Sequence, residues 1–118
     1  MAMRRGEIRL VELDPAVGTE AKKRRPAVIV SNDQAVRQVA VLNRGVVTVV
    51  PLTSNTEKVY LFQTLLLKDR TGLKKDSKAQ SEQIRALDVS RVGPQLGMVP
   101  PDLMREIDEA LQLHLGLG

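Results

Sequence analysis

Hydrophobic and polar residues follow one another along most of the chain in short stretches that are typical of β-strands. Residues 7–13 alternate polar and apolar positions with period two, which predicts a half-buried strand. Residues 26–30 are apolar throughout, as in a strand that is buried on both faces. We expect three further strands, at residues 46–52, 59–67 and 77–87. Pro51 either ends the first of these or places it at a sheet edge.

The period changes in the last part of the chain. Residues 101–115 have apolar positions at helical spacing, after Pro100-Pro101 and before Gly116, and they predict a helix. Residues 88–97 are expected to form a turn, and residues 34–44 a short helix or a loop. The pattern therefore predicts an α+β fold, a small barrel-like domain of about five strands followed by a C-terminal helix.

Composition limits the chemistry that is available to this chain. Its 118 residues suit a single domain, residues 1–118, and 18 Lys+Arg against 14 Asp+Glu weakly favour an anionic partner. Because there is no cysteine and only one histidine, disulfides and thiol catalysis are excluded and a zinc site is disfavoured. No apolar run approaches the ~20 residues of a membrane span, and the N-terminus has no signal-peptide pattern. We therefore expect a cytoplasmic protein that does not enter a membrane.

The remaining candidates for chemistry are arginines and hydroxyls at two strand ends. Arg24 and Arg25 precede the 26–30 strand, and Thr53-Ser54 follow the 46–52 strand. If these strands are neighbours, arginine and hydroxyl meet at one sheet edge and form a candidate active site. In the alternative interpretation, the arginines only solvate a strand end and Thr53-Ser54 only form a turn. The single histidine, His114, falls on the helix face that we expect to be in the core or at its rim, which disfavours a histidine-based triad.

Several fragments of the sequence together resemble one family. They occur in that family's order and spacing over nearly the whole chain: Arg5-Gly6-Glu7-Ile8, Leu13-Asp14-Pro15, Gly18-Thr19-Glu20, Arg25 to Asn32, Val49 to Ser54, Asp76-Ser77, Glu82 to Arg85 and Glu109-Ala110-Leu111. The chain resembles the MazF/PemK family of toxin endoribonucleases. The resemblance implies a CcdB/MazF-like barrel related to SH3 folds, assembled as a homodimer. It also implies cleavage of single-stranded RNA at a short sequence without a metal or other cofactor, and inhibition by a small acidic, MazE-like antitoxin.

The resemblance also assigns roles to residues. Arg25 matches the family's catalytic arginine and Thr53 its catalytic threonine, while the remaining residues are expected to bind substrate: Thr19, Glu20, Arg24, Asn32, Ser54 and Gln83. Thr19 stands where serine is common and keeps a hydroxyl, whereas Ala21 stands where glutamine is frequent, so a polar contact from that position is lost.

The expected mechanism uses the substrate's own 2′-hydroxyl as nucleophile and yields a 2′,3′-cyclic phosphate and a 5′-hydroxyl end. Arg25 would stabilise the charged phosphorane and Thr53 would donate a further hydrogen bond. Glu20 is the candidate general base, or it orients Arg25. Two rival functions remain: a CcdB-like toxin that binds gyrase without cutting RNA, and an inactive domain that only binds RNA or antitoxin.

Overall fold

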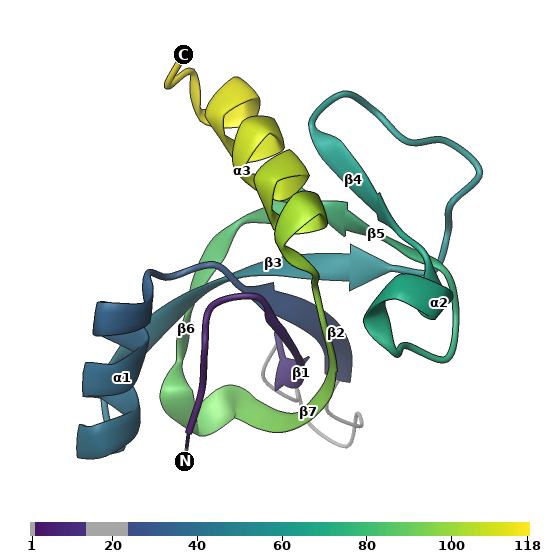
Figure 1. The fold of residues 1–118 in the computed structure, drawn as a ribbon. Coiled ribbons are helices and arrows are strands. Elements are labelled where there is room, and N and C mark those ends of the chain that lie inside the picture. Colours follow the sequence, from purple (N-terminus) through teal and green to yellow (C-terminus); the bar gives the residue numbers. More distant parts are fainter. Residues whose placement is uncertain (1, 14–23) are drawn as a thin grey trace, which may run out of the picture.

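The computed structural model describes residues 2–13 and 24–118 (Figure 1). In this part of the chain, seven strands form one antiparallel sheet in the order β4-β5-β3-β2-β1-β7, and β6 also pairs with β3. The strands are β1 (Glu7–Glu12), β2 (Arg24–Ile29), β3 (Val46–Thr53), β4 (Gln63–Leu66), β5 (Ser77–Gln80), β6 (Arg85–Asp88) and β7 (Val92–Met98). The helices are α1 (Asp33–Leu42), α2 (Lys68–Thr71) and α3 (Pro101–Leu115), with short 3₁₀ turns η1 (Ser81–Gln83) and η2 (Val89–Arg91).

The α+β class and the C-terminal helix are confirmed, whereas the expected barrel of about five strands is not, since the described residues form a seven-stranded sheet. The sheet is open, because its edge strands β4 and β7 do not pair with each other in the described part of the chain. The strand expected at residues 77–87 is divided into β5 and β6 by η1. The 88–97 segment, expected as a turn, contains η2 and most of β7.

The sequence pattern does not predict β7, because this strand contains glycine and proline, which disfavour strands in general. Gly93 and Gly97 are required there by close backbone approaches. A Cβ at Gly93 would lie 2.8 Å from the Leu10 carbonyl oxygen, and one at Gly97 would lie 2.3 Å from the Thr71 carbonyl oxygen. Glycine thus lets β7 pack against β1 on one side and α2 on another, although it lowers the strand propensity of the segment.

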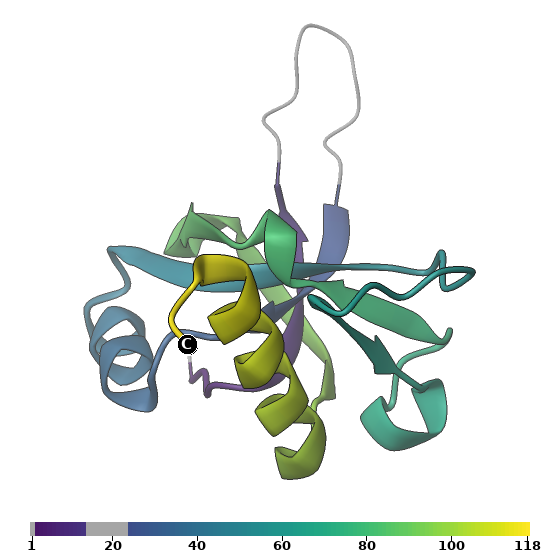
Figure 2. The ribbon, with the colours of Figure 1, turned by 90° about the horizontal axis from the view of Figure 1, so that it is seen from above.

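Two layers of apolar side chains extend from the two faces of the sheet. Alternate residues of β2 and β3 belong to opposite faces. One face contributes Ala27, Ile29, Val47 and Val49, which pack in a cluster with Val36 of α1. The other contributes Val28, Val50 and Leu52, which pack with Leu103, Met104 and Ile107 of α3. The helix α3 crosses the sheet in Figure 2, while α1 and α2 lie at opposite sides of the molecule in both ribbon views.

The ambiguous segment at residues 34–44 forms a regular helix, α1. Asn32 caps it, because the Asn32 side-chain oxygen accepts a hydrogen bond from the Ala35 N–H at 2.8 Å. Asn43 ends the helix in the left-handed conformation, with φ of 52°. None of the helices in the described part of the chain is long and apolar enough to cross a membrane.

Pro51 is buried inside the sheet, which corrects the expectation that it ends a strand or lies at an edge. It pairs with Ala27 of β2 on one side of β3. On the other side, β3 changes partner from β6, whose last pair involves Val49, to β5, whose first pair involves Leu52. The missing N–H of Pro51 therefore falls at the break between two ladders, where no strand requires it.

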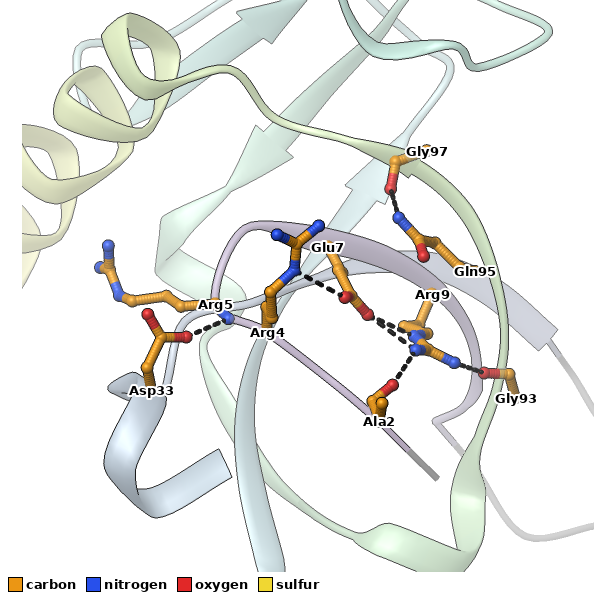
Figure 3. Close-up of polar contacts among 9 residues, drawn as sticks. All are labelled: Ala2, Arg4, Arg5, Glu7, Arg9, Asp33, Gly93, Gln95 and Gly97. Carbon is orange, nitrogen blue, oxygen red and sulfur yellow. Dashed lines mark hydrogen bonds and ion pairs between the residues drawn. The ribbon is translucent and has the colours of Figure 1, made fainter. Parts of the chain in front are cut away.

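The polar face of β1 is buried, so the expectation of a half-buried strand is wrong here. Glu7 and Arg9 are only 4% and 7% exposed. Arg9 donates to the Glu7 carboxylate at 2.7 Å and 3.0 Å, to the Ala2 carbonyl at 2.7 Å and to the Gly93 carbonyl at 3.2 Å (Figure 3). The N-terminal segment thus covers this face of β1 and is joined through Arg9 to β7.

Candidate active site

The strands β2 and β3 separate at one end of the sheet. Their mutual ladder reaches only as far as the pair Ala27–Pro51. Beyond it, β2 stays paired with β1 as far as Arg24, and β3 stays paired with β5 as far as Thr53. The two strands therefore form a fork, whose two prongs carry the residues that the sequence indicated as chemically important.

A pocket of about 460 Å³ lies at this fork, and we call it the fork pocket. Its lining comes from the two prongs, from the segment that joins α2 to β5, and from β7: Arg25, Pro26, Leu52, Thr53, Ser54, Gly72, Leu73, Lys74, Lys75, Ser77 and Leu96. The structure thus brings Arg25 and Thr53, which are 28 positions apart in the sequence, to one pocket.

The two side chains are presented differently. Arg25 is exposed and forms no hydrogen bond or ion pair with any residue that the structure describes. Thr53 is half-buried, and its hydroxyl oxygen accepts a hydrogen bond from the Asn55 N–H at 3.3 Å. Because the oxygen is used as an acceptor, the hydroxyl proton remains available for donation to a ligand. The pair therefore offers a guanidinium that no described residue engages and an oriented hydroxyl donor.

The charge of the fork pocket is positive. Among the described residues that line it, three are cationic, Arg25, Lys74 and Lys75, and none is acidic. The nearest acid in sequence, Asp76, instead accepts a hydrogen bond from the Lys68 N–H at 2.9 Å. The remaining large side chains are apolar, so the pocket suits a ligand that combines a phosphate with an apolar ring.

A second pocket, of about 310 Å³, shares Arg25 with the first. We call it the Gln83 pocket; its lining is Leu13, Arg25, Pro51, Gln80, Gln83 and Arg85. Gln83 ends η1 and is exposed, while its neighbour Glu82 accepts a hydrogen bond from the Gln63 amide at 2.7 Å and ties η1 to β4. Arg25 thus stands where two pockets meet, one rich in cations and the other in side-chain amides.

The other predicted binding residues do not all gather here. Ser54 lines the fork pocket. Arg24 lies instead at a small separate pocket, where it pairs with Glu12 of β1 at 3.4 Å. Asn32 caps α1 beyond the opposite end of β2 from Arg25. Thr19 and Glu20 lie outside the described residues.

Sequence reasoning missed the lysines of the α2–β5 segment. Residues 68–75 follow the expected 59–67 strand as a charged stretch without an assigned role, and this segment holds Lys74 and Lys75 at the fork pocket. The only signal in the sequence is the pair of adjacent lysines. His114 is exposed on α3, with its ring centroid 6.4 Å from that of Phe62, and so occupies a rim position. Among the described residues, no group of three or more His, Asp or Glu is arranged to hold a metal ion.

An open antiparallel sheet, with a C-terminal helix on one face and a cationic pocket at its fork, defines a small α+β protein suited to an anionic ligand. Residues 4–115 match the family described as "PemK-like, MazF-like toxin of type II toxin-antitoxin system". The chain belongs to this family, as the sequence motifs predicted. It is 55% identical over 115 residues to "Endoribonuclease MazF9" of Mycobacterium tuberculosis, with 98% of each chain covered.

Solved structures with a similar fold also carry the names of toxins of this family. One is titled "Endoribonuclease in complex with its cognate antitoxin from Mycobacterial species"; its TM-score is 0.76 at 26% identity, with 99% of this chain and 98% of that chain covered. Another is a MazE-MazF complex from Deinococcus radiodurans, with a TM-score of 0.77 at 26% identity and coverage of 98% and 97%. These matches favour the MazF interpretation over the CcdB-like alternative.

Proposed function

We propose that this protein is the toxin of a type II toxin–antitoxin system and acts as a metal-independent endoribonuclease on single-stranded RNA. The observation that supports this most directly is the presence of Arg25 and Thr53 in one positively charged pocket. A homologue that is 55% identical over nearly its whole length carries the name endoribonuclease. The fork pocket would hold the phosphodiester that is cut.

The proposed reaction is an internal transfer within the RNA. The 2′-hydroxyl attacks the neighbouring phosphorus, and the bond between phosphorus and the 5′-oxygen breaks. The products are a 2′,3′-cyclic phosphate on one fragment and a 5′-hydroxyl on the other. Because the nucleophile belongs to the substrate, no metal-activated water is needed. The enzyme has to stabilise added charge on the phosphorane oxygens and to manage two protons.

Arg25 is suited to the first task. A guanidinium stays charged at neutral pH and can donate two parallel hydrogen bonds to phosphate oxygens. Among the described residues Arg25 has no side-chain hydrogen bond or ion pair, so none of them competes with the phosphate for its guanidinium. Thr53 adds a second donor, because the Asn55 N–H occupies its oxygen and leaves its proton for a phosphate oxygen. Losing one such donor typically lowers kcat by a factor of about 10²–10³.

Proton transfer is assigned to Arg25 and Glu20. We propose that Glu20 takes the proton of the 2′-hydroxyl, or orients Arg25 for catalysis. Arg25 donates a proton to the departing 5′-oxygen, whose alkoxide form is strongly basic. Glu20 belongs to the segment that joins β1 to β2, five positions before Arg25.

Recognition of the RNA sequence is assigned to polar side chains around Arg25. Single-stranded RNA is usually recognised through splayed bases whose edges accept and donate hydrogen bonds. Gln83, which lines the Gln83 pocket, and Ser54, which lines the fork pocket, would make such contacts, with Thr19 and Arg24 as further candidates. Asn32 caps α1 beyond the opposite end of β2 and is less suited to this role. Tyr60 and Phe62 stack on each other, with ring centroids 5.3 Å apart, and neither lines the two pockets. Base edges rather than stacking would therefore carry selectivity.

The proposed partners follow from the same family. Two structural relatives are complexes of a toxin with its antitoxin, so we propose a small acidic, MazE-like antitoxin for this chain. We also propose that the active form is a homodimer and that it works in the cytoplasm, where mRNA is exposed to it.

The decisive experiment compares purified wild-type protein with Arg25→Ala and Thr53→Ala on a long single-stranded RNA in the presence of EDTA. We expect the wild type to cut and to leave cyclic phosphate ends, and we expect both variants to remain folded without cutting. Arg37→Ala, which removes an exposed arginine from α1, is the matched control and should cut normally.

Four results would contradict the proposal or part of it. Cutting by either active-site variant at the wild-type rate would refute the residue assignment, and a requirement for added metal would exclude the mechanism. A parallel gyrase supercoiling assay identifies the CcdB-like rival, which would inhibit gyrase and leave RNA intact. Inactivity in both assays, with RNA or antitoxin still bound, would identify a binding-only domain.

A further inference from the structure

Two lysines that the proposed reaction does not use line the fork pocket. We propose that Lys74 and Lys75 bind the phosphate next to the scissile one, so that the fork pocket holds one unpaired nucleotide between two phosphate sites. This inference rests on the proposed function, because it assumes that Arg25 and Thr53 hold the phosphate that reacts. It assigns the two lysines to substrate positioning rather than to the chemical step.

The backbone that carries the lysines is held in place by local hydrogen bonds. Gly72 ends α2 with φ of 82° and donates its N–H to the Lys68 carbonyl at 3.0 Å. The Asp76 carboxylate closes the segment by accepting the Lys68 N–H at 2.9 Å. The Ser77 hydroxyl donates to the Lys75 carbonyl at 3.2 Å. A segment fixed in this way presents its side chains with little backbone entropy left to lose on binding.

The charges of this region are distributed unequally. Arg70 of α2 is neutralised by Asp102 of α3, at 2.8 Å. Lys74 and Lys75 form no ion pair with any described residue, although Asp76 is adjacent. Their positive charge is therefore directed at the pocket they line and at solvent. A lysine ammonium acts as a point charge on phosphate and does not demand the planar geometry of a guanidinium.

The size and lining of the pocket indicate a nucleotide rather than a single phosphate. Its volume of about 460 Å³ lies within the ~300–1,000 Å³ range that is usual for sites of small organic ligands. Leu73 and Leu96 supply apolar surface beside the lysines, against which a base or ribose can lie. A phosphate at Arg25 and another at the lysines then correspond to the two phosphates that flank one nucleoside.

The test uses Lys74→Gln/Lys75→Gln and a control that removes the same charge elsewhere. The control is Arg37→Gln/Arg44→Gln, which changes two exposed arginines in α1 and directly after it. Both ribbon views place α1 on the opposite side of the molecule from α2 (Figures 1 and 2). Each protein is titrated with an RNA that carries 2′-deoxyribose at the cut site, and Kd is measured over a series of salt concentrations.

Each phosphate contact on a single strand contributes about −0.7 to the slope of log affinity against log salt. Because the two lysines share one phosphate, losing both should make the slope shallower by about 0.7, and each single lysine variant should lose less than that. The same slope means that the double variant binds about fivefold more weakly at ~0.1 M salt, with the loss vanishing near ~1 M. With cleavable RNA, we expect KM to rise by a similar factor and kcat to stay within about twofold, since the contact is equal in ground and transition states.

The results distinguish a failure of the proposed function from a failure of the lysine assignment alone. If the wild type neither binds nor cuts RNA, the proposed function itself fails. If the wild type cuts while the lysine variants keep its salt slope, only the lysine assignment is wrong. The assignment is also overturned if the Arg37/Arg44 control loses as much slope, because net charge alone would then explain the effect, or if kcat falls while KM stays constant.

Discussion

Replacing Arg9 by methionine should destabilise the protein strongly, because it leaves a buried carboxylate without its partner. The side chains of Glu7 and Arg9 are only 5% and 8% exposed and are 2.7 Å apart. Among the described residues, the other cation paired with Glu7 is Arg4, at 3.6 Å with a side chain that is 71% exposed. Solvent screens such an exposed partner and it cannot replace Arg9.

The magnitude follows from burial and from the lost hydrogen bonds. Removing one member of a buried ion pair typically costs about 3–5 kcal/mol. In addition, the carbonyls of Ala2 and Gly93 lose the donors that Arg9 supplies. The double variant Glu7→Leu/Arg9→Met removes both charges together, and such replacements are often close to neutral. We therefore expect the double variant to recover at least half of the loss.

The measurement is urea unfolding, followed by circular dichroism, at one fixed protein concentration for all variants, because association would shift the apparent stability. With an m-value of ~1.5 kcal/mol/M, a loss of ~3 kcal/mol lowers the midpoint by about 2 M. A midpoint shift under about 0.5 M for Arg9→Met would refute the reasoning. So would a double variant that is as unstable as the single one, since the two charges would then not be coupled.

Two further predictions concern local contacts. Asn32→Ala should cost about 1 kcal/mol in urea unfolding because α1 loses its cap, and Asn32→Ser should restore most of that loss; equal midpoints for wild type and Asn32→Ala would contradict the cap. The hydrogen bond from Arg70 lowers the pKa of Asp102 below its usual 3.8. The ionised form therefore stabilises the fold above pH ~4, and this contribution is lost as the pH falls through the lowered pKa. Asp102→Asn should weaken the drop in urea midpoint between pH 7 and pH 3, and an unchanged drop would show that the pair is not linked to folding.

The parts of the fold that the sequence predicts are those with one dominant physical signal. Continuous apolar residues identify β2 and β3, and helical spacing with a proline start and a glycine stop identifies α3. The missed strand, β7, is set by close approaches of Gly93 and Gly97 to distant backbone, which no local pattern reveals. The shortening of the 59–67 strand to β4 has a similar cause, since residues before Gln63 form a loop despite their strand-forming composition.

The residues of the candidate site likewise differ in whether the sequence alone can indicate them. Arg25 and Thr53 could be indicated from the sequence because each stands at the end of a recognisable strand, and their meeting requires only that the strands be neighbours. Lys74 and Lys75 could not, since their place depends on how α2 and the segment after it fold against the fork. Asn32 follows the end of β2 by three positions, but its side chain is engaged at the start of α1.

At the fork between β2 and β3, residues of the central strands and residues of more peripheral segments line the same pockets, and mutations in the two groups have different consequences. Arg25 and Thr53 are fixed by the central strands, which share the buried core of the protein. Part of the surrounding wall comes instead from η1, β7 and the segment after α2. Mutations in those walls can therefore change which ligand fits the pockets while the proposed catalytic residues stay in register. A lineage of such proteins can diversify its targets without rebuilding its chemistry.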